Sequence, residues 1–203
     1  GEYRHLLVSP FALRERVMEL IDQEMEKGEE GYIFLKLNSI TDRTLIDKLT
    51  QASQAGVEIV MNVRGICCLL PGIQGLTGNI RVFSVVGRYL EHSRIYCFGR
   101  GKGARLYISS ADFMTRNTER RVEVACPVLE KQARKRLLYI IEELQRDNVK
   151  ARVLEPDGSY RHRKDEGEPH NCQEEFQQET VPEPIRERLP RWKKLGRLFH
   201  RHQ

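Results

Sequence analysis

A histidine and an arginine stand two residues apart where an apolar, alternating run begins. His92 and Arg94 lie in the run from Arg88 to Phe98. Because residues i and i+2 of a strand point to the same face, we expect their imidazole and guanidinium groups to project side by side. Arginine binds phosphate oxygens through paired hydrogen bonds, and histidine handles a proton or a phosphoryl group. The pair predicts a site for phosphoryl chemistry; the alternative is a surface pair on an edge strand.

Two further segments extend this predicted site. Residues 105–108 read as a strand, and the turn after it carries hydroxyl, carboxylate and amide groups at Ser109, Ser110, Asp112 and Asn117. Arg64 follows an apolar strand and precedes Gly65, which lets the backbone turn sharply. Ligands on helix-covered sheets usually bind beyond the carboxyl ends of strands, so Arg64 is a candidate ligand residue. The alternative for Arg64 is a surface ion pair.

Strand and helix patterns alternate along the body of the chain. This rhythm predicts an α/β fold with a mixed, mainly parallel sheet covered by helices. Strands are expected at residues 4–8, 32–37, 57–63, 80–86, 95–98, 105–108, 120–125 and 149–154, and Gly99–Gly103 reads as a hairpin turn. Helices are expected to begin at Ser9 and Pro10, at Thr41 or Asp42, and at Leu129.

The charge of the chain is uneven. The sequence has 34 Lys and Arg residues and 29 Asp and Glu residues, a net charge of +5. Ten bases and ten acids lie from Glu155 onward, so the whole surplus belongs to residues 1–154. A basic body favours an anionic partner, although ordinary solubility charge explains a surplus of this size equally well.

Other sequence features bear on the cellular compartment. We find no apolar run long enough to span a bilayer and no signal peptide, so a cytoplasmic protein is expected. The five cysteines show neither a C-x-x-C pair nor the spacing of metal ligands, which predicts reduced, mostly buried thiols and no metal site.

The end of the chain differs from its body. Residues 165–183 contain seven acidic residues and no lysine or arginine, which is typical of a disordered linker. Residues 186–201 contain seven bases, and Trp192, Leu195, Leu198 and Phe199 could line one side of a basic amphipathic helix. Such a helix could contact a membrane surface, an acidic partner or the acidic linker. We therefore predict a domain over residues 1–160 and a flexible, charged tail over residues 161–203.

Three ordered motifs resemble the C-terminal catalytic domain of bacterial polyphosphate kinases of the first type. They are Asn-Val-Arg-Gly at residues 62–65, the run at residues 88–96 and the turn at residues 109–117. The resemblance covers residues 4–160 and implies a phospholipase D-like fold, in which two similar halves each supply a histidine to one active site. Arg94 stands where ordinary phospholipase D enzymes have lysine, in agreement with the kinase family.

The resemblance implies reversible transfer of the terminal phosphate of ATP to polyphosphate. It assigns the catalytic role to His92 and the binding of nucleotide phosphate to Arg64, Arg94, Ser110 and Asn117. It further implies Mg²⁺, with ligands outside this chain. The partners it implies are ATP or ADP, inorganic polyphosphate, the preceding domains of the same enzyme and a homo-oligomer, with no nucleic acid. The histidine that becomes phosphorylated lies in a preceding domain of the family, so this chain alone is expected to be inactive.

Two other functions are compatible with the residues. One is a phospholipase D-type phosphodiesterase that builds its site across a dimer, although that class would have lysine at the position of Arg94. The other is a non-catalytic module that binds polyphosphate or a nucleotide.

Overall fold

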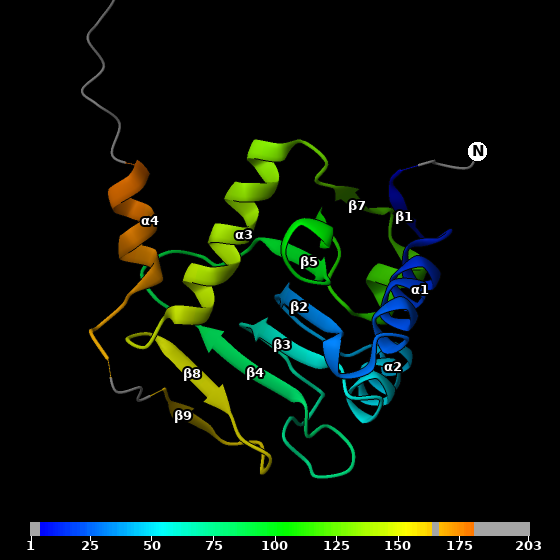
Figure 1. Ribbon diagram of the computed structural model, residues 1–203, viewed down its shortest axis with the longest axis horizontal. Helices are drawn as coiled ribbons and strands as arrows, with labels where there is room; N and C mark the ends of the chain where they lie inside the picture. The colour runs from blue at the N-terminus through cyan, green and yellow to red at the C-terminus, as the bar shows by residue number, and fades with distance from the viewer. Residues whose placement is uncertain (1–4, 164–166, 181–203) are drawn as a thin grey trace, which may run out of the picture. The chain divides into compact units, whose positions relative to one another are not determined.

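Nine strands of the described residues form one mixed sheet (Figure 1). The computed structural model describes residues 5–163 and 167–180, and the chain divides into compact units at residues 1–173 and 174–203. The sheet belongs to the first unit, with strand order β1-β7-β6-β5-β2-β3-β4-β8-β9. The strands are β1 (Leu7–Ser9), β2 (Tyr32–Leu37), β3 (Glu58–Val63), β4 (Ile80–Val85), β5 (Arg94–Phe98), β6 (Arg105–Ser109), β7 (Glu123–Pro127), β8 (Ala151–Leu154) and β9 (Tyr160–His162).

The sheet is less parallel than the sequence predicts. Only β2, β3 and β4 pair in parallel, whereas β5, β6, β7 and β1 extend the sheet antiparallel on one side and β8 and β9 on the other. The prediction of a mixed, helix-covered α/β sheet is confirmed, and its mainly parallel character is wrong. The physical reason is that parallel neighbours need a crossover connection, whereas short connections join β5 to β6 and β8 to β9 as antiparallel hairpins.

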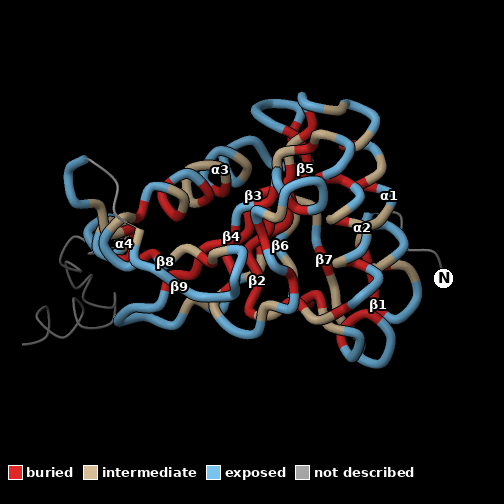
Figure 2. The backbone as a smooth tube through the Cα atoms, turned by 90° about the horizontal axis from the view of Figure 1, so that it is seen from below, coloured by how far each residue is buried: buried red, intermediate tan, exposed pale blue. Residues whose placement is uncertain are grey.

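Helices α1 (Leu13–Met25) and α2 (Arg43–Gln54) pack against each other and against one face of the sheet. Their buried residues recur at helical spacing, and Figure 2 shows how burial follows the central strands and the inner sides of these helices. Of the two predicted caps of α2, Thr41 and Asp42, the structure has Asp42, whose carboxylate accepts the Leu45 N–H at 3.2 Å. The predicted cap at Ser9 is wrong, because Ser9 belongs to β1 and its hydroxyl donates to the carbonyl of Asn117 at 2.6 Å.

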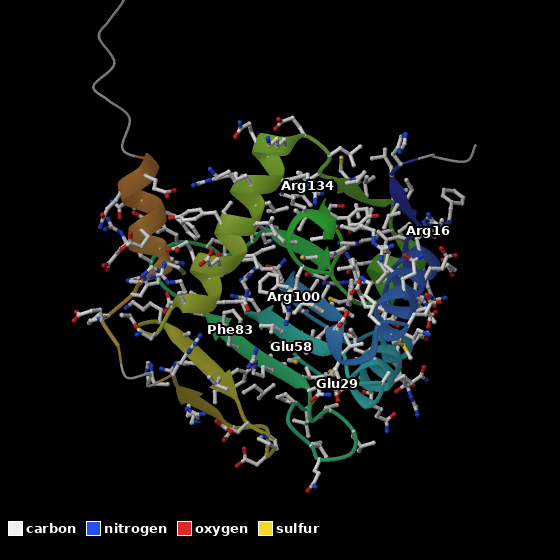
Figure 3. The ribbon with its side chains drawn as sticks, viewed as in Figure 1. Arg16, Glu29, Glu58, Phe83, Arg100 and Arg134 are labelled. Atoms are coloured by element: carbon white, nitrogen blue, oxygen red, sulfur yellow. The ribbon has the colours of Figure 1, made fainter. Side chains whose placement is uncertain are left out.

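Helix α3 (Lys131–Arg146) covers the opposite face. Side chains alternate along strands, so Tyr32 and its partner Glu58 point away from the α1–α2 core. The Tyr32 hydroxyl donates to Gln145 of α3 at 3.3 Å. Arg134 of α3 donates to the carbonyl of Ala104 at 2.7 Å, after the short 3₁₀ turn at Gly101–Gly103. Figure 3 shows Arg100 and Glu58 on this face, where they form an ion pair.

The compact unit ends at Gln173 rather than at the predicted residue 160. Strand β9 pairs with β8, and the Cys172 N–H donates to the Asp147 carboxylate at 3.0 Å. Helix α4 (Cys172–Thr180) lies in the segment predicted as a disordered linker. A polar composition does not reveal such single, specific contacts, which explains the difference. The predicted basic helix at residues 186–201 lies outside the described residues.

Two remaining expectations concern cysteines and membranes. Cys97 and Cys172 are buried and Cys67 is half-buried, but Cys68 and Cys126 are exposed, so the expectation of mostly buried thiols is only partly met. Within residues 5–163 and 167–180, the helices are too short and too polar to cross a membrane.

Candidate active site

The site forms where β2 and β3 end. These strands are parallel and in register, so Leu37 and Val63 end them at the same edge of the sheet. Asn38 follows the first strand and Arg64 the second. Strand β5 runs antiparallel to β2 and begins at Arg94, beside the same edge. The topology therefore brings Arg64 and Arg94 together from segments thirty residues apart in the sequence, at the carboxyl ends of the parallel strands.

A chain of hydrogen bonds connects the two arginines. The Arg64 Nε donates to the side-chain oxygen of Asn38. The Asn38 amide nitrogen donates to the carboxylate of Asp112 at 3.3 Å, and the Asn38 backbone N–H donates to the same carboxylate at 2.6 Å. Arg94 donates to both Asp112 oxygens, from Nε at 3.3 Å and from Nη2 at 3.0 Å. We call Arg64, Asn38, Asp112 and Arg94 the arginine network.

His92 lies against the arginine network. Arg94 Nη1 donates to the His92 carbonyl at 3.0 Å and lies 3.4 Å from its Nδ1. The expected contact between the two side chains is present, although β5 begins at Arg94 and His92 belongs to the preceding loop. His92 is exposed, while the side chain of Arg94 is only 14% exposed. The imidazole of the exposed His92 is thus positioned by a partly buried guanidinium that is itself paired with a carboxylate.

Arginine has donors only, so its contact with His92 also indicates a tautomer. If Arg94 donates to Nδ1, this nitrogen accepts, and the proton of the neutral imidazole resides on Nε2. Nε2 of the exposed His92 is then a hydrogen-bond donor.

Ser110 and Asn117 bind a different carboxylate. The Ser110 hydroxyl donates to Glu123, and the Asn117 amide donates to Glu123 at 2.7 Å. Among the described residues, no hydrogen bond joins this cluster to the arginine network, and the buried Oδ1 of Asn117 has no partner there. The negative charge of Glu123 disfavours phosphate beside it, so the geometry gives less support to Ser110 and Asn117 as phosphate ligands than to Arg64.

The sequence reasoning gave no role to three buried residues of this site, although it named Asp112 as a member of the turn. Asn38 and Asp112 connect the arginines, and Lys36 is a lysine that is only 1% exposed inside an apolar strand. Burial lowers the pKa of the Lys36 ammonium, an effect that the Glu91 carboxylate opposes. Asn38 follows its strand as Arg64 follows the next one, so the rule that selected Arg64 could also have selected Asn38. The lysine in an otherwise apolar run was a visible signal too.

The donor set of this site does not suit Mg²⁺. The two carboxylates of the site face cations, since Asp112 pairs with Arg94 and Glu91 pairs with Lys36. Within the described residues, no three His, Cys, Asp or Glu side chains gather as metal ligands would. We therefore derive no step through a metal held by this chain.

A cavity of about 470 Å³ lies elsewhere, among β4, β8 and the end of α3. Its lining includes Phe83, Gln145 and Arg161, and none of the predicted site residues. Its three arginines are occupied, since Arg81 pairs with Glu58, Arg161 pairs with Glu155, and Arg163 donates to the Gln145 carbonyl. Figure 3 labels Phe83, one of the residues that line this cavity. The positive charges of this cavity are already engaged, whereas Arg64 has no carboxylate partner among the described residues, so the arginine network is the better candidate for chemistry.

Solved structures define the class of this domain. It superimposes on Nuc from Salmonella typhimurium, a phospholipase D family member, with a TM-score of 0.54 at 15% identity over 74% of this chain and 96% of that one. The fold is therefore phospholipase D-like. The polyphosphate kinase of Porphyromonas gingivalis is more similar, with a TM-score of 0.83 and 40% identity over 88% of this chain and 28% of that one.

The family follows from the sequence comparisons. Residues 6–173 match the family described as polyphosphate kinase C-terminal domain 2. The chain is 50% identical over 161 residues to a polyphosphate kinase of Bacillus cereus, which covers 78% of this chain and 23% of the relative. The chain belongs to the polyphosphate kinase family and spans about a quarter of the length of its curated relatives.

Proposed function

We propose that this domain carries part of the active site of an ATP–polyphosphate phosphotransferase, as the C-terminal catalytic domain of a longer enzyme. In this reaction the bond between the γ-phosphorus and the β,γ-bridging oxygen of ATP breaks. A phosphorus–oxygen bond to the end of a polyphosphate chain forms in its place, and ADP leaves. The observation that carries the proposal is that Arg64 and His92 meet at one edge of the sheet through the arginine network.

The chemistry of phosphoryl transfer suits these groups. Its transition state is loose, with charge on the equatorial oxygens, so positioning and cationic stabilisation dominate. Arg64 is half-buried, and among the described residues no carboxylate forms an ion pair with it. It supplies fixed positive charge to the nucleotide phosphates in the ground state and in the transition state. His92, with its proton on Nε2, donates to the phosphoryl group as it moves.

The partners belong to the same proposal. ATP or ADP and polyphosphate are the substrates, Mg²⁺ accompanies ATP with ligands outside this chain, and the preceding domains supply the histidine that is phosphorylated. Homo-oligomerisation and membrane contact of the basic tail stay predictions.

Variants of Arg64 and His92 in the full-length enzyme test the proposal. Arg64→Ala should weaken ATP binding by roughly 10- to 100-fold, because hydrogen bonds to charged groups contribute binding free energy of that size. It should lower turnover too. Arg64→Lys should recover little, because an ammonium lacks the bidentate geometry. His92→Ala should lower turnover by roughly a hundredfold and leave ATP affinity nearly unchanged. His92→Gln keeps a hydrogen-bond donor but cannot titrate, so recovery with this variant indicates positioning rather than proton transfer.

The matched control is Arg43→Ala, which removes a charge from a side chain that is 92% exposed on α2. This variant should change neither quantity. Near-normal turnover of a folded His92→Ala variant would refute the role of His92. Hydrolysis of a phosphodiester substrate would favour the phosphodiesterase, and ATP binding without turnover in the full-length protein would favour a binding module.

A further inference from the structure

Lys36 contacts the loop on both sides of His92. Its Nζ lies 3.2 Å from the carbonyl oxygen of Glu91 and 3.2 Å from the carbonyl oxygen of Ser93. A Glu91 carboxylate oxygen lies at 3.2 Å as well. An ammonium has three donors, and here three oxygens surround it. The buried lysine therefore fixes the two residues that flank His92.

Gln173 holds the same loop from the other side. Its side-chain oxygen accepts the Tyr89 N–H at 3.0 Å, and its amide nitrogen donates to the Tyr89 carbonyl at 2.9 Å. The same nitrogen donates to the Glu91 carboxylate at 2.8 Å. Gln173 is 5% exposed, and the Glu91 side chain is 13% exposed. Glu91 thus connects the lysine to the glutamine.

Gly87 leaves the space that this contact needs. A Cβ at residue 87 would lie 2.5 Å from the side-chain oxygen of Gln173 and 3.0 Å from its Cδ. These separations are too short for nonbonded atoms, so a larger residue at this position would displace the Gln173 amide. The absence of a side chain at Gly87, near the start of the loop, therefore makes room for the Gln173 amide.

We propose that Lys36, Glu91 and Gln173 form a clamp that positions His92 for phosphoryl transfer. This inference rests on the proposed function and adds three positioning residues to it, none of which is required to touch a substrate. In the part of the chain that the structure describes, the side chain that hydrogen-bonds to His92 is that of Arg94, through the His92 carbonyl and Nδ1. A misplacement of about 1 Å is enough to cost roughly a hundredfold in rate.

The environment of Lys36 supports this role. Burial of a lysine is unfavourable unless its charge is paired, and burial lowers the pKa of Lys36 while the Glu91 carboxylate opposes the change. A methionine would suit an apolar strand better than this lysine does. The residue type is therefore explained by its three contacts with the loop rather than by packing.

Order in the loop and the kinetics of the enzyme test the clamp separately. In the ¹⁵N-labelled 203-residue chain, Lys36→Met and Gly87→Ala should each lower the heteronuclear NOE of the His92 and Ser93 amides. In the full-length enzyme both variants should lower kcat by roughly 10- to 100-fold, with little change in KM for ATP, because Arg64 is untouched. Glu91→Gln, which keeps both backbone acceptors for Lys36, should have a smaller effect.

A double variant shows whether Gly87 acts through Gln173. Gln173→Ala removes the atoms that the new Cβ would meet, so Gly87→Ala with Gln173→Ala should be no worse than Gln173→Ala alone. Gly103→Ala is the matched control, because nothing lies within 4 Å of a Cβ at that residue. It should leave both the NOE and kcat unchanged.

Unchanged NOE values in the folded Lys36→Met and Gly87→Ala variants would overturn the clamp. If one variant fails to fold, an unchanged NOE in the other is enough to overturn it. Loss of order with unchanged kcat would overturn it as well. His92→Ala, assayed in parallel, distinguishes this failure from failure of the proposed function, because normal turnover of that variant removes the role of His92 itself.

Discussion

Asp112 should be among the most costly residues of this domain to replace. Its carboxylate is 8% exposed and accepts two hydrogen bonds from Arg94 and one from the Asn38 backbone at 2.6 Å. Asp112→Ala leaves a guanidinium that is 14% exposed without its counter-charge. Breaking such a buried pair from one side costs about 3–5 kcal/mol. The variant also leaves the Asn38 backbone N–H without its acceptor, which adds to the loss of stability.

The measurement is thermal and urea-induced unfolding followed by circular dichroism. A chain of this size changes its Tm by roughly 2–4 °C per kcal/mol, so Asp112→Ala should lower Tm by roughly 6–20 °C. Adding Arg94→Met should restore part of the loss, because the charge that lacks a partner is then removed. Glu130→Ala is the control, since this exposed carboxylate accepts the Ala133 N–H as the cap of α3 and pairs with no cation among the described residues.

Two outcomes would refute the reasoning about Asp112. One is a loss of stability no larger than that of Glu130→Ala. The other is a double variant with Arg94→Met that is as unstable as Asp112→Ala or less stable. Either result would mean that the ion pair is weakly coupled to folding and that other contacts hold Arg94 in place.

Two predictions concern the cysteines. In a thiol-labelling experiment on the native chain, the exposed Cys68 and Cys126 should react quickly. Cys97 and Cys172 should react only after unfolding, because burial raises the pKa of their thiols. Fast labelling of Cys97, located by mass spectrometry, would contradict this. Burial raises the pKa of Cys97 from 9.0 to about 12, so its contribution to stability is complete below pH 9 and is lost as the pH rises to about 12. Urea titrations should therefore show a smaller loss of stability over this range for Cys97→Ala than for the unaltered chain, and equal slopes would argue against it.

Local sequence patterns predicted most of the secondary structure. The Asp42 cap, the hairpin at Gly99–Gly103 and the strands on either side of it depend on nearest neighbours, and the structure has them where they were expected. The helical spacing in α1 was correct, but its start was not, because Ser9 bonds to a carbonyl 108 residues away. Contacts between distant residues have no local signal, so a single sequence cannot reveal them.

The same distinction applies to the site. The rule that ligands meet strands at their carboxyl ends selected Arg64, and the spacing of His92 and Arg94 identified a real contact. The carboxylate that pairs with Arg94 lies 18 residues away, and Gln173 lies 82 residues from Glu91. Both contacts arise from the folding of distant segments onto one another. The sequence alone could therefore propose which residues act, but not which of them are already paired.

The ion pairs of the site indicate which cations are available to a ligand and which are not. Asp112 balances the charge of Arg94, and Glu91 balances that of Lys36. Arg64 instead bonds to the neutral amide of Asn38, and its field acts to lower the pKa of Lys36, although less than burial does. Without a ligand, Arg64 and Lys36 therefore repel each other. An anion bound at Arg64 reduces this repulsion while the paired cations keep their partners. We therefore expect phosphate binding at this edge to depend on Arg64, and the position of His92 to depend on Arg94 and Lys36.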